Sequence, residues 1–156
     1  MGRICAGTVV GVLKRRWPII VFVVWTVYVW TTRIVNAWSA SDESTTAKVI
    51  STASAVVLLG LGIAVARVLV VARARAMTAG ESRLVMILAA GTIVVWVVRV
   101  PQLLLDDRGA AFKVVHLVLG AISVGLAALS IRRARAESHA EDEPARAVSP
   151  AANGAR

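Results

Sequence analysis

Residues 84–105 read LVMILAAGTIVVWVVRVPQLLL, twenty-two residues in which Arg99 is the single charge. A helix rises about 1.5 Å per residue, so ~20 apolar residues cross the ~30 Å hydrocarbon core of a bilayer. Valine and isoleucine are also abundant in buried strands, but strands run ~4–8 residues and this stretch is far longer. The stretch therefore predicts a transmembrane helix.

Three further stretches of this kind occur in the 156-residue chain, which is 58% hydrophobic with a mean hydropathy of +0.74. In lipid only helices or closed barrels satisfy the backbone, and the alternation that a barrel needs is absent. We predict an all-α integral membrane four-helix bundle over residues 1–133. A disordered cytoplasmic tail is expected over residues 134–156, because Ala, Pro, Ser and mixed charge cannot form a core. The predicted spans are residues 17–36, 48–72, 84–105 and 113–132.

The net charge of +9 is divided unequally between the two sides of these spans. Residues 1–16, 67–83 and 132–156 carry thirteen cations against five anions, or +8, whereas the other side carries five against four, or +1. Lys and Arg accumulate in short cytoplasmic loops. The charge therefore predicts a plasma (inner) membrane protein with both termini in the cytoplasm, and it does not predict nucleic-acid binding.

The chain also repeats itself. The pattern W-x-x-R-[IV]-x-[NQ] occurs at 30–36 and at 96–102, and K-V-[IV]-x9-G-L-x5-R occurs at 48–67 and at 113–132. The ordered polar identities predict a duplication, with each half a transmembrane hairpin. Two tandem hairpins share one orientation, so we expect their pseudo-two-fold axis to lie along the membrane normal.

The second and fourth spans are rich in small residues, which allow close helix packing in lipid. We expect these two helices to make the tightest contacts, and their faces to hold a possible protein partner or a second copy of the chain. The candidate packing residues are Gly60, Gly62, Gly120 and Gly125.

A thin polar layer is predicted at the outer ends of the spans. One interpretation is structural: Arg33 and Arg99 extend to outer phosphates or pair with nearby Asp residues, and His116 bonds to a neighbouring helix or to Asp106. The other is functional: the repeated arginines form an anion or lipid-headgroup site, because guanidinium binds phosphate in a bidentate manner. The candidate residues of the layer are Arg33, Asn36, Lys48, Arg99, Gln102, Lys113 and His116.

Residues for catalysis or metal binding are scarce in the sequence. The spans contain no Asp or Glu, which disfavours proton-coupled transport. His116 is the single histidine of the spans and Cys5 is the single cysteine, so neither a metal site nor a nucleophilic triad can be assembled. We expect no enzymatic activity and no cofactor.

Two stretches carry a likeness to known proteins: residues 30–38 followed by Lys48 and Val49, and residues 112–119 with Ser123 and Gly125. Through them each half resembles the small two-helix membrane proteins of actinobacteria. The resemblance implies no activity, cofactor or catalytic residue.

These observations predict a non-enzymatic accessory, scaffold or assembly subunit of a membrane complex. Two alternatives remain open at this point. One is an oligomeric transport or holin-like pore component, and the other is lipid or anion binding at the outer leaflet through Arg33 and Arg99.

Overall fold

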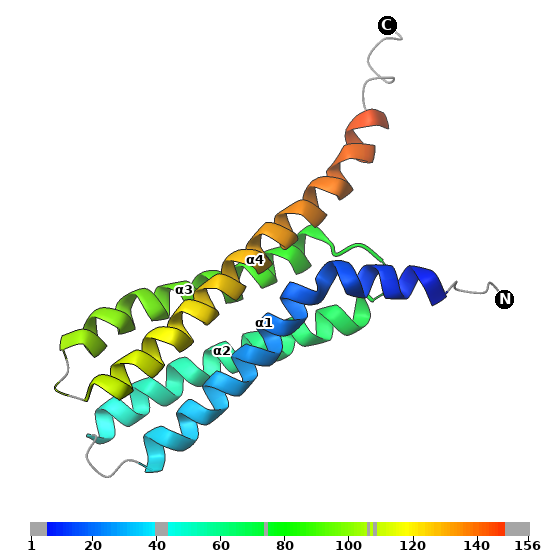
Figure 1. The fold of residues 1–156 in the computed structure, drawn as a ribbon. Coiled ribbons are helices and arrows are strands. Elements are labelled where there is room, and N and C mark those ends of the chain that lie inside the picture. Colours follow the sequence, from blue (N-terminus) through cyan, green and yellow to red (C-terminus); the bar gives the residue numbers. More distant parts are fainter. Residues whose placement is uncertain (1–5, 40–43, 74, 106, 108, 149–156) are drawn as a thin grey trace, which may run out of the picture.

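The fold is an all-α bundle of four long helices, as the apolar stretches predict (Figure 1). The computed structural model describes residues 6–39, 44–73, 75–105, 107 and 109–148. Each helix contains a segment long and apolar enough to cross a membrane. The helices are α1 (Ala6–Ser39), α2 (Thr45–Val71), α3 (Ala79–Leu105) and α4 (Ala110–Val148).

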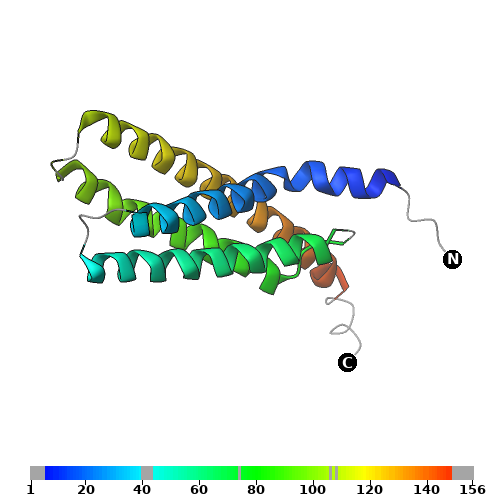
Figure 2. The ribbon, with the colours of Figure 1, turned by 90° about the horizontal axis from the view of Figure 1, so that it is seen from below.

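The helices pack in the cyclic order α1, α2, α3, α4, with α4 returning to α1. The start of α1, the end of α2, the start of α3 and the end of α4 lie together, which we call the termini end (Figures 1 and 2). The opposite ends of the four helices form the hairpin end. The most extensive contacts are within the pairs α1–α2 and α3–α4. The sequence predicted the tightest contacts for α2 and α4. Each of them packs most extensively against the other helix of its own hairpin, and α2 and α4 are not neighbours in the ring.

The apolar side chains divide between a narrow core and a broad outer surface. Phe22, Leu58 and Leu88 are fully or almost fully buried between the helices. Large side chains such as Val57 and Val97 instead point outward. A surface of this kind is unfavourable in water but suits contact with acyl chains, where helices need no polar exterior. The outer surface thus agrees with four membrane spans.

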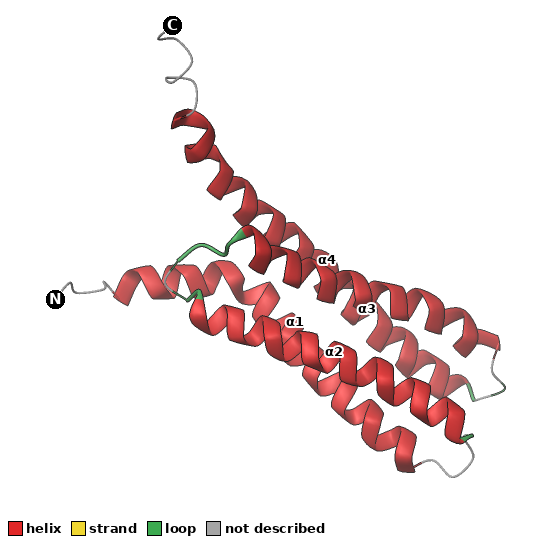
Figure 3. Ribbon diagram, turned by 180° about the vertical axis from the view of Figure 1, so that it is seen from behind, coloured by secondary structure: helices red, strands yellow, loops and turns green. Residues whose placement is uncertain are grey.

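Polar side chains join α1 to α4 along the termini half of the bundle. Trp25 Nε1 donates to Ser123 Oγ at 2.9 Å, and Ser130 Oγ donates to the carbonyl oxygen of Pro18 at 3.5 Å. Pro18 has no N–H to donate to the preceding turn, and α1 changes direction in this N-terminal part (Figure 3).

Of the four candidate packing glycines, two contact other helices. A Cβ on Gly120 would lie 2.7 Å from Trp96 Cε3, and one on Gly62 would lie 3.6 Å from Thr26 Cγ2. A Cβ on Gly60 or Gly125 would meet nothing within 4 Å. Gly60 and Gly125 therefore take no part in packing inside the chain, and they lie on outward faces.

The predicted start of the disordered tail is wrong. The helix α4 continues to Val148, so residues 134–148 are helical, and Ala134 and Glu137 are buried. The Ala, Arg and Glu residues that suggested a solvated tail are also strong helix formers, and a buried ion pair at Glu137 attaches the extension to the bundle. The rest of the predicted tail, residues 149–156, lies outside the described residues, as does Cys5.

Candidate functional site

A cavity of about 470 Å³ lies at the hairpin end, a volume within the range of small-ligand sites. All four helices contribute to its wall. Most of the wall is apolar or aromatic, with a few polar groups converging from different helices. The lining residues are Tyr28, Val29, Trp30, Thr32, Arg33, Asn36 and Ala37 of α1, Ser51 of α2, Trp96 and Arg99 of α3, and Phe112, Val115, His116 and Leu119 of α4.

Two hydrogen-bond donors in this wall have no acceptor. Trp96 is 7% exposed, and its Nε1 is buried with no hydrogen-bond partner among the described residues. Arg99 Nε is likewise buried with no such partner. An unsatisfied buried donor costs ~1–3 kcal/mol, and more when it is charged. Both donors belong to residues that line the cavity, and neither has an acceptor among the described residues.

Arg33 brings a second guanidinium to the cavity. Its Cζ lies 5.9 Å from the centroid of the Trp30 ring, a cation–π contact that agrees with the spacing of three residues on a helix. Trp30 and Trp96 are both buried, so the cavity is bounded by two indoles as well as by two arginines. The repeated W-x-x-R pattern thus supplies one Trp and one Arg from each hairpin to the same wall.

The position of Trp96 depends on Gly120. The six-membered ring of Trp96 lies so close to the Gly120 backbone that a Cβ there would meet three of its atoms within 3.3 Å. Glycine on α4 therefore lets the indole of α3 approach the neighbouring helix closely.

The Asp106 partner that the sequence predicted for His116 lies outside the described residues, and the described contacts of His116 are within its own helix. Its Nδ1 lies 2.9 Å from the carbonyl oxygen of Phe112, and its ring lies 4.0 Å from the Phe112 ring centroid. Because a carbonyl oxygen can only accept, Nδ1 carries the proton in this contact. The nitrogen left for a ligand is Nε2.

The structure brings together four of the seven predicted polar-layer residues: Arg33, Asn36, Arg99 and His116. The other three are outside the lining. Lys113 Nζ donates to the carbonyl oxygen of Leu104 at 2.9 Å, near the end of α3. Gln102 is exposed, and Lys48 lies half-buried near the start of α2. Sequence reasoning missed Ser51, which follows the first K-V-[IV] pattern as His116 follows the second.

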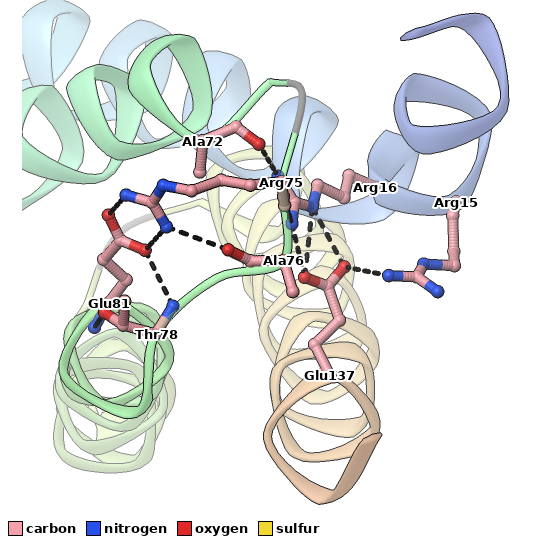
Figure 4. A network of polar contacts seen from close by, with 8 residues as sticks. All are labelled: Arg15, Arg16, Ala72, Arg75, Ala76, Thr78, Glu81 and Glu137. Atoms are coloured by element: carbon pink, nitrogen blue, oxygen red, sulfur yellow. Dashed lines mark hydrogen bonds and ion pairs between the residues drawn. The ribbon is translucent and has the colours of Figure 1, made fainter. Parts of the chain in front are cut away.

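A second polar cluster at the termini end has no counterpart in the sequence-based predictions (Figure 4). Arg16 is 2% exposed and Glu137 is 3% exposed, and Arg16 Nη2 lies 2.6 Å from Glu137 Oε2. Arg16 Nη1 and Nη2 also donate to the carbonyl oxygens of Ala72 and Arg75, at 2.8 and 2.9 Å. All three guanidinium nitrogens are therefore used within the chain, which indicates a structural contact among α1, the α2–α3 connection and α4.

The neighbouring ion pair, Arg75 with Glu81, is more exposed than the pair of Arg16 and Glu137. Arg75 binds Glu81 through two hydrogen bonds of 2.7 and 2.6 Å. The Glu81 carboxylate also accepts from the backbone N–H of Thr78, and the Glu81 N–H donates to Thr78 Oγ1, which together form a capping box at the start of α3. This arrangement positions the connection that Arg16 then contacts.

The four membrane-length helices and their apolar exterior define a small multi-pass α-helical membrane protein. No family model, no curated protein and no solved structure matches the chain.

Proposed function

We propose that this protein is a non-enzymatic accessory protein of the plasma membrane that binds a phosphate-bearing anion in the hairpin-end cavity. Arg33 and Arg99 supply the charge, and Trp96 Nε1 supplies a neutral donor. The observation that carries the proposal is the pair of buried donors without acceptors, Trp96 Nε1 and Arg99 Nε, in a cavity open to a ligand. Phosphate oxygens satisfy such donors, and guanidinium binds them at two points.

The proposal favours anion binding over the other two functions that the sequence left open. Scaffolding and pore formation both need an association surface, for which the exposed faces around Gly60 and Gly125 are the candidates. A face of small residues does not indicate the chemistry of its partner. The cavity does indicate its ligand, because it combines volume, positive charge and donors without acceptors among the described residues. We therefore base the proposed accessory role on ligand binding in the cavity. Gly60 and Gly125 are the predicted contact points for a second protein.

The double variant Arg33→Gln/Arg99→Gln tests the ligand. We expect wild-type protein in mild detergent to gain thermal stability from a phosphate-bearing anion, offered as inorganic phosphate or as phosphatidylglycerol in mixed micelles. Losing even one charge-assisted contact costs ~1.5–3 kcal/mol, so the double variant should bind at least about tenfold more weakly. Binding is measured as the shift in melting temperature over a ligand titration.

Arg132→Gln is the matched control, because Arg132 is an exposed arginine of α4 outside the cavity lining. It should keep the wild-type response. If neither form of phosphate stabilises wild-type protein, or if the double variant responds as wild type does, the proposed function is wrong.

We also propose that the termini end faces the cytoplasm, because it carries the +8 share of the charge. A fluorescent protein that folds only in the cytoplasm, fused after residue 156, should then be bright. Alkaline phosphatase, which is active only outside the cytoplasm, should be inactive at the same position and active when inserted after Asp107. The reverse pattern of the two reporters would overturn the orientation and would place the cavity in the inner leaflet.

A further inference from the structure

We infer that the ligand of the cavity is an anionic phospholipid, and that it reaches the cavity sideways from the bilayer, between α1 and α4. This inference rests on the proposed function and deepens it, since phosphate could also come from a soluble anion. Three features of the structure support a lipid: where the bundle opens, what lines the opening, and how the polar and apolar parts of the wall are arranged.

Side chains join α1 to α4 in the termini half of the bundle, whereas the cavity is lined by both helices in the hairpin half. In the termini half, the helices are joined by Arg16 with Glu137, by Pro18 with Ser130 and by Trp25 with Ser123. Toward the hairpin end the ribbons of α1 and α4 lie apart in the view from below (Figure 2). The cavity begins one turn beyond Trp25 along α1, at Tyr28. The Trp25–Ser123 bond thus lies at the inner limit of a lateral opening.

The opening is lined by side chains that face both the cavity and the surroundings of the bundle. Tyr28 of α1 is 60% exposed and Val115 of α4 is 56% exposed, although both line the cavity. In a membrane span, such outward-facing residues contact acyl chains. A molecule already in the bilayer can therefore reach the cavity without crossing a polar barrier.

The cavity wall has a charged part and an apolar part side by side, which matches the headgroup and acyl chains of a lipid. The charged groups, Arg33 and Arg99, lie six residues from the ends of α1 and α3, or about 9 Å along the helix axis. That depth is near the boundary where lipid phosphates lie. Tyr28, Val115 and Leu119 extend the wall as an apolar surface beside the charged groups. A free phosphate would cover the arginines but leave that apolar surface unused, whereas a phospholipid covers both.

The test is a variant that narrows the opening without touching the arginines. Val115→Trp adds a bulky side chain at an exposed position on the cavity wall, and Val118→Trp adds the same side chain at an exposed position of α4 that does not line the cavity. Retention of phosphatidylglycerol against phosphatidylcholine is measured by native mass spectrometry, after delipidation and incubation with equimolar mixed micelles. In parallel, thermal shifts are recorded with inorganic phosphate.

Wild type and Val118→Trp should retain phosphatidylglycerol in preference to phosphatidylcholine, and Val115→Trp should retain roughly fivefold less because the lateral path is filled. The melting temperature of each Trp variant without ligand verifies that it folds, and Val118→Trp should keep the wild-type thermal shift with inorganic phosphate.

Three results would overturn the inference, and they separate it from the proposed function. If wild type responds to inorganic phosphate but shows no preference for phosphatidylglycerol, the ligand is a soluble anion and only the lipid inference fails. If both Trp variants lose phosphatidylglycerol equally, the lipid binds the outer surface and not the cavity. If wild type responds to neither phosphate nor phosphatidylglycerol, the inference and the proposed function fail together.

Discussion

Replacing Glu137 by alanine is expected to destabilise the bundle by about 3–5 kcal/mol, the usual effect of removing one partner from a buried ion pair. Glu137 accepts from Arg16 through both carboxylate oxygens, at 2.9 and 2.6 Å, where both side chains are almost completely buried. Without the carboxylate, the Arg16 guanidinium remains buried with two backbone carbonyls as its acceptors. Thermal unfolding in mild detergent, followed by circular dichroism, measures the loss.

Glu81→Ala is the matched control, since Glu81 binds Arg75 in an exposed pair. Exposed pairs contribute ~0–1 kcal/mol, and the lost cap adds a similar amount, so this variant should lose far less stability. The double variant Arg16→Ala/Glu137→Ala should lose clearly less than the sum of the two single variants, because each single variant leaves a buried charge without its main partner. Wild-type stability in Glu137→Ala would show that the α4 extension is not held by this contact.

Replacing Gly120 by alanine is expected to cost about 1–3 kcal/mol, the range for overpacking a tight interior. The added Cβ would lie 2.7 Å from Trp96 Cε3, a distance that real Cβ atoms do not tolerate. The indole is rigid and buried, so relief requires movement of the ring or of the α3–α4 interface. Because Trp96 lines the cavity, the variant should also weaken the response to phosphatidylglycerol.

Gly125→Ala isolates the effect of the methyl group itself. Gly125 lies on the same helix, and a Cβ there would meet nothing within 4 Å. Alanine has the higher helix propensity, by up to ~1 kcal/mol, so Gly125→Ala should unfold at or slightly above the wild-type temperature. Equal melting temperatures for Gly120→Ala and Gly125→Ala would contradict the close approach of Trp96 to α4.

The fold class could be predicted because length and hydropathy are properties of the chain alone. A run such as residues 84–105 is too long for a strand and too apolar for water, which leaves a membrane helix. Part of the candidate site followed from the repeated W-x-x-R pattern, because equivalent positions in two hairpins of the same orientation lie at the same depth. The depth of a residue along a helix follows from counting residues, and these counts predicted that Arg33, Arg99 and His116 lie at a similar depth.

The sequence could not predict in the same way which side of each helix faces the interior of the bundle. Lys113 and His116 are both near the start of α4, yet His116 lines the cavity whereas Lys113 caps the end of α3. Gly120 and Gly125 are equally small, and only Gly120 faces a neighbouring helix. The apolar faces of a membrane helix differ little in hydropathy, so the pattern does not distinguish the inward face from the lipid-facing one.

The sequence by itself determined four membrane-length helices and the position of Arg33, Arg99 and His116 near the hairpin ends of their helices, since both depend on local composition and on the rise of a helix. Only the tertiary structure decided that Arg16 meets Glu137 across 121 residues, that α4 continues beyond the bundle, and that two donors of the cavity-lining residues have no acceptor in the described part of the chain. These features depend on which helices become neighbours, and side chains from distant parts of the chain set that choice.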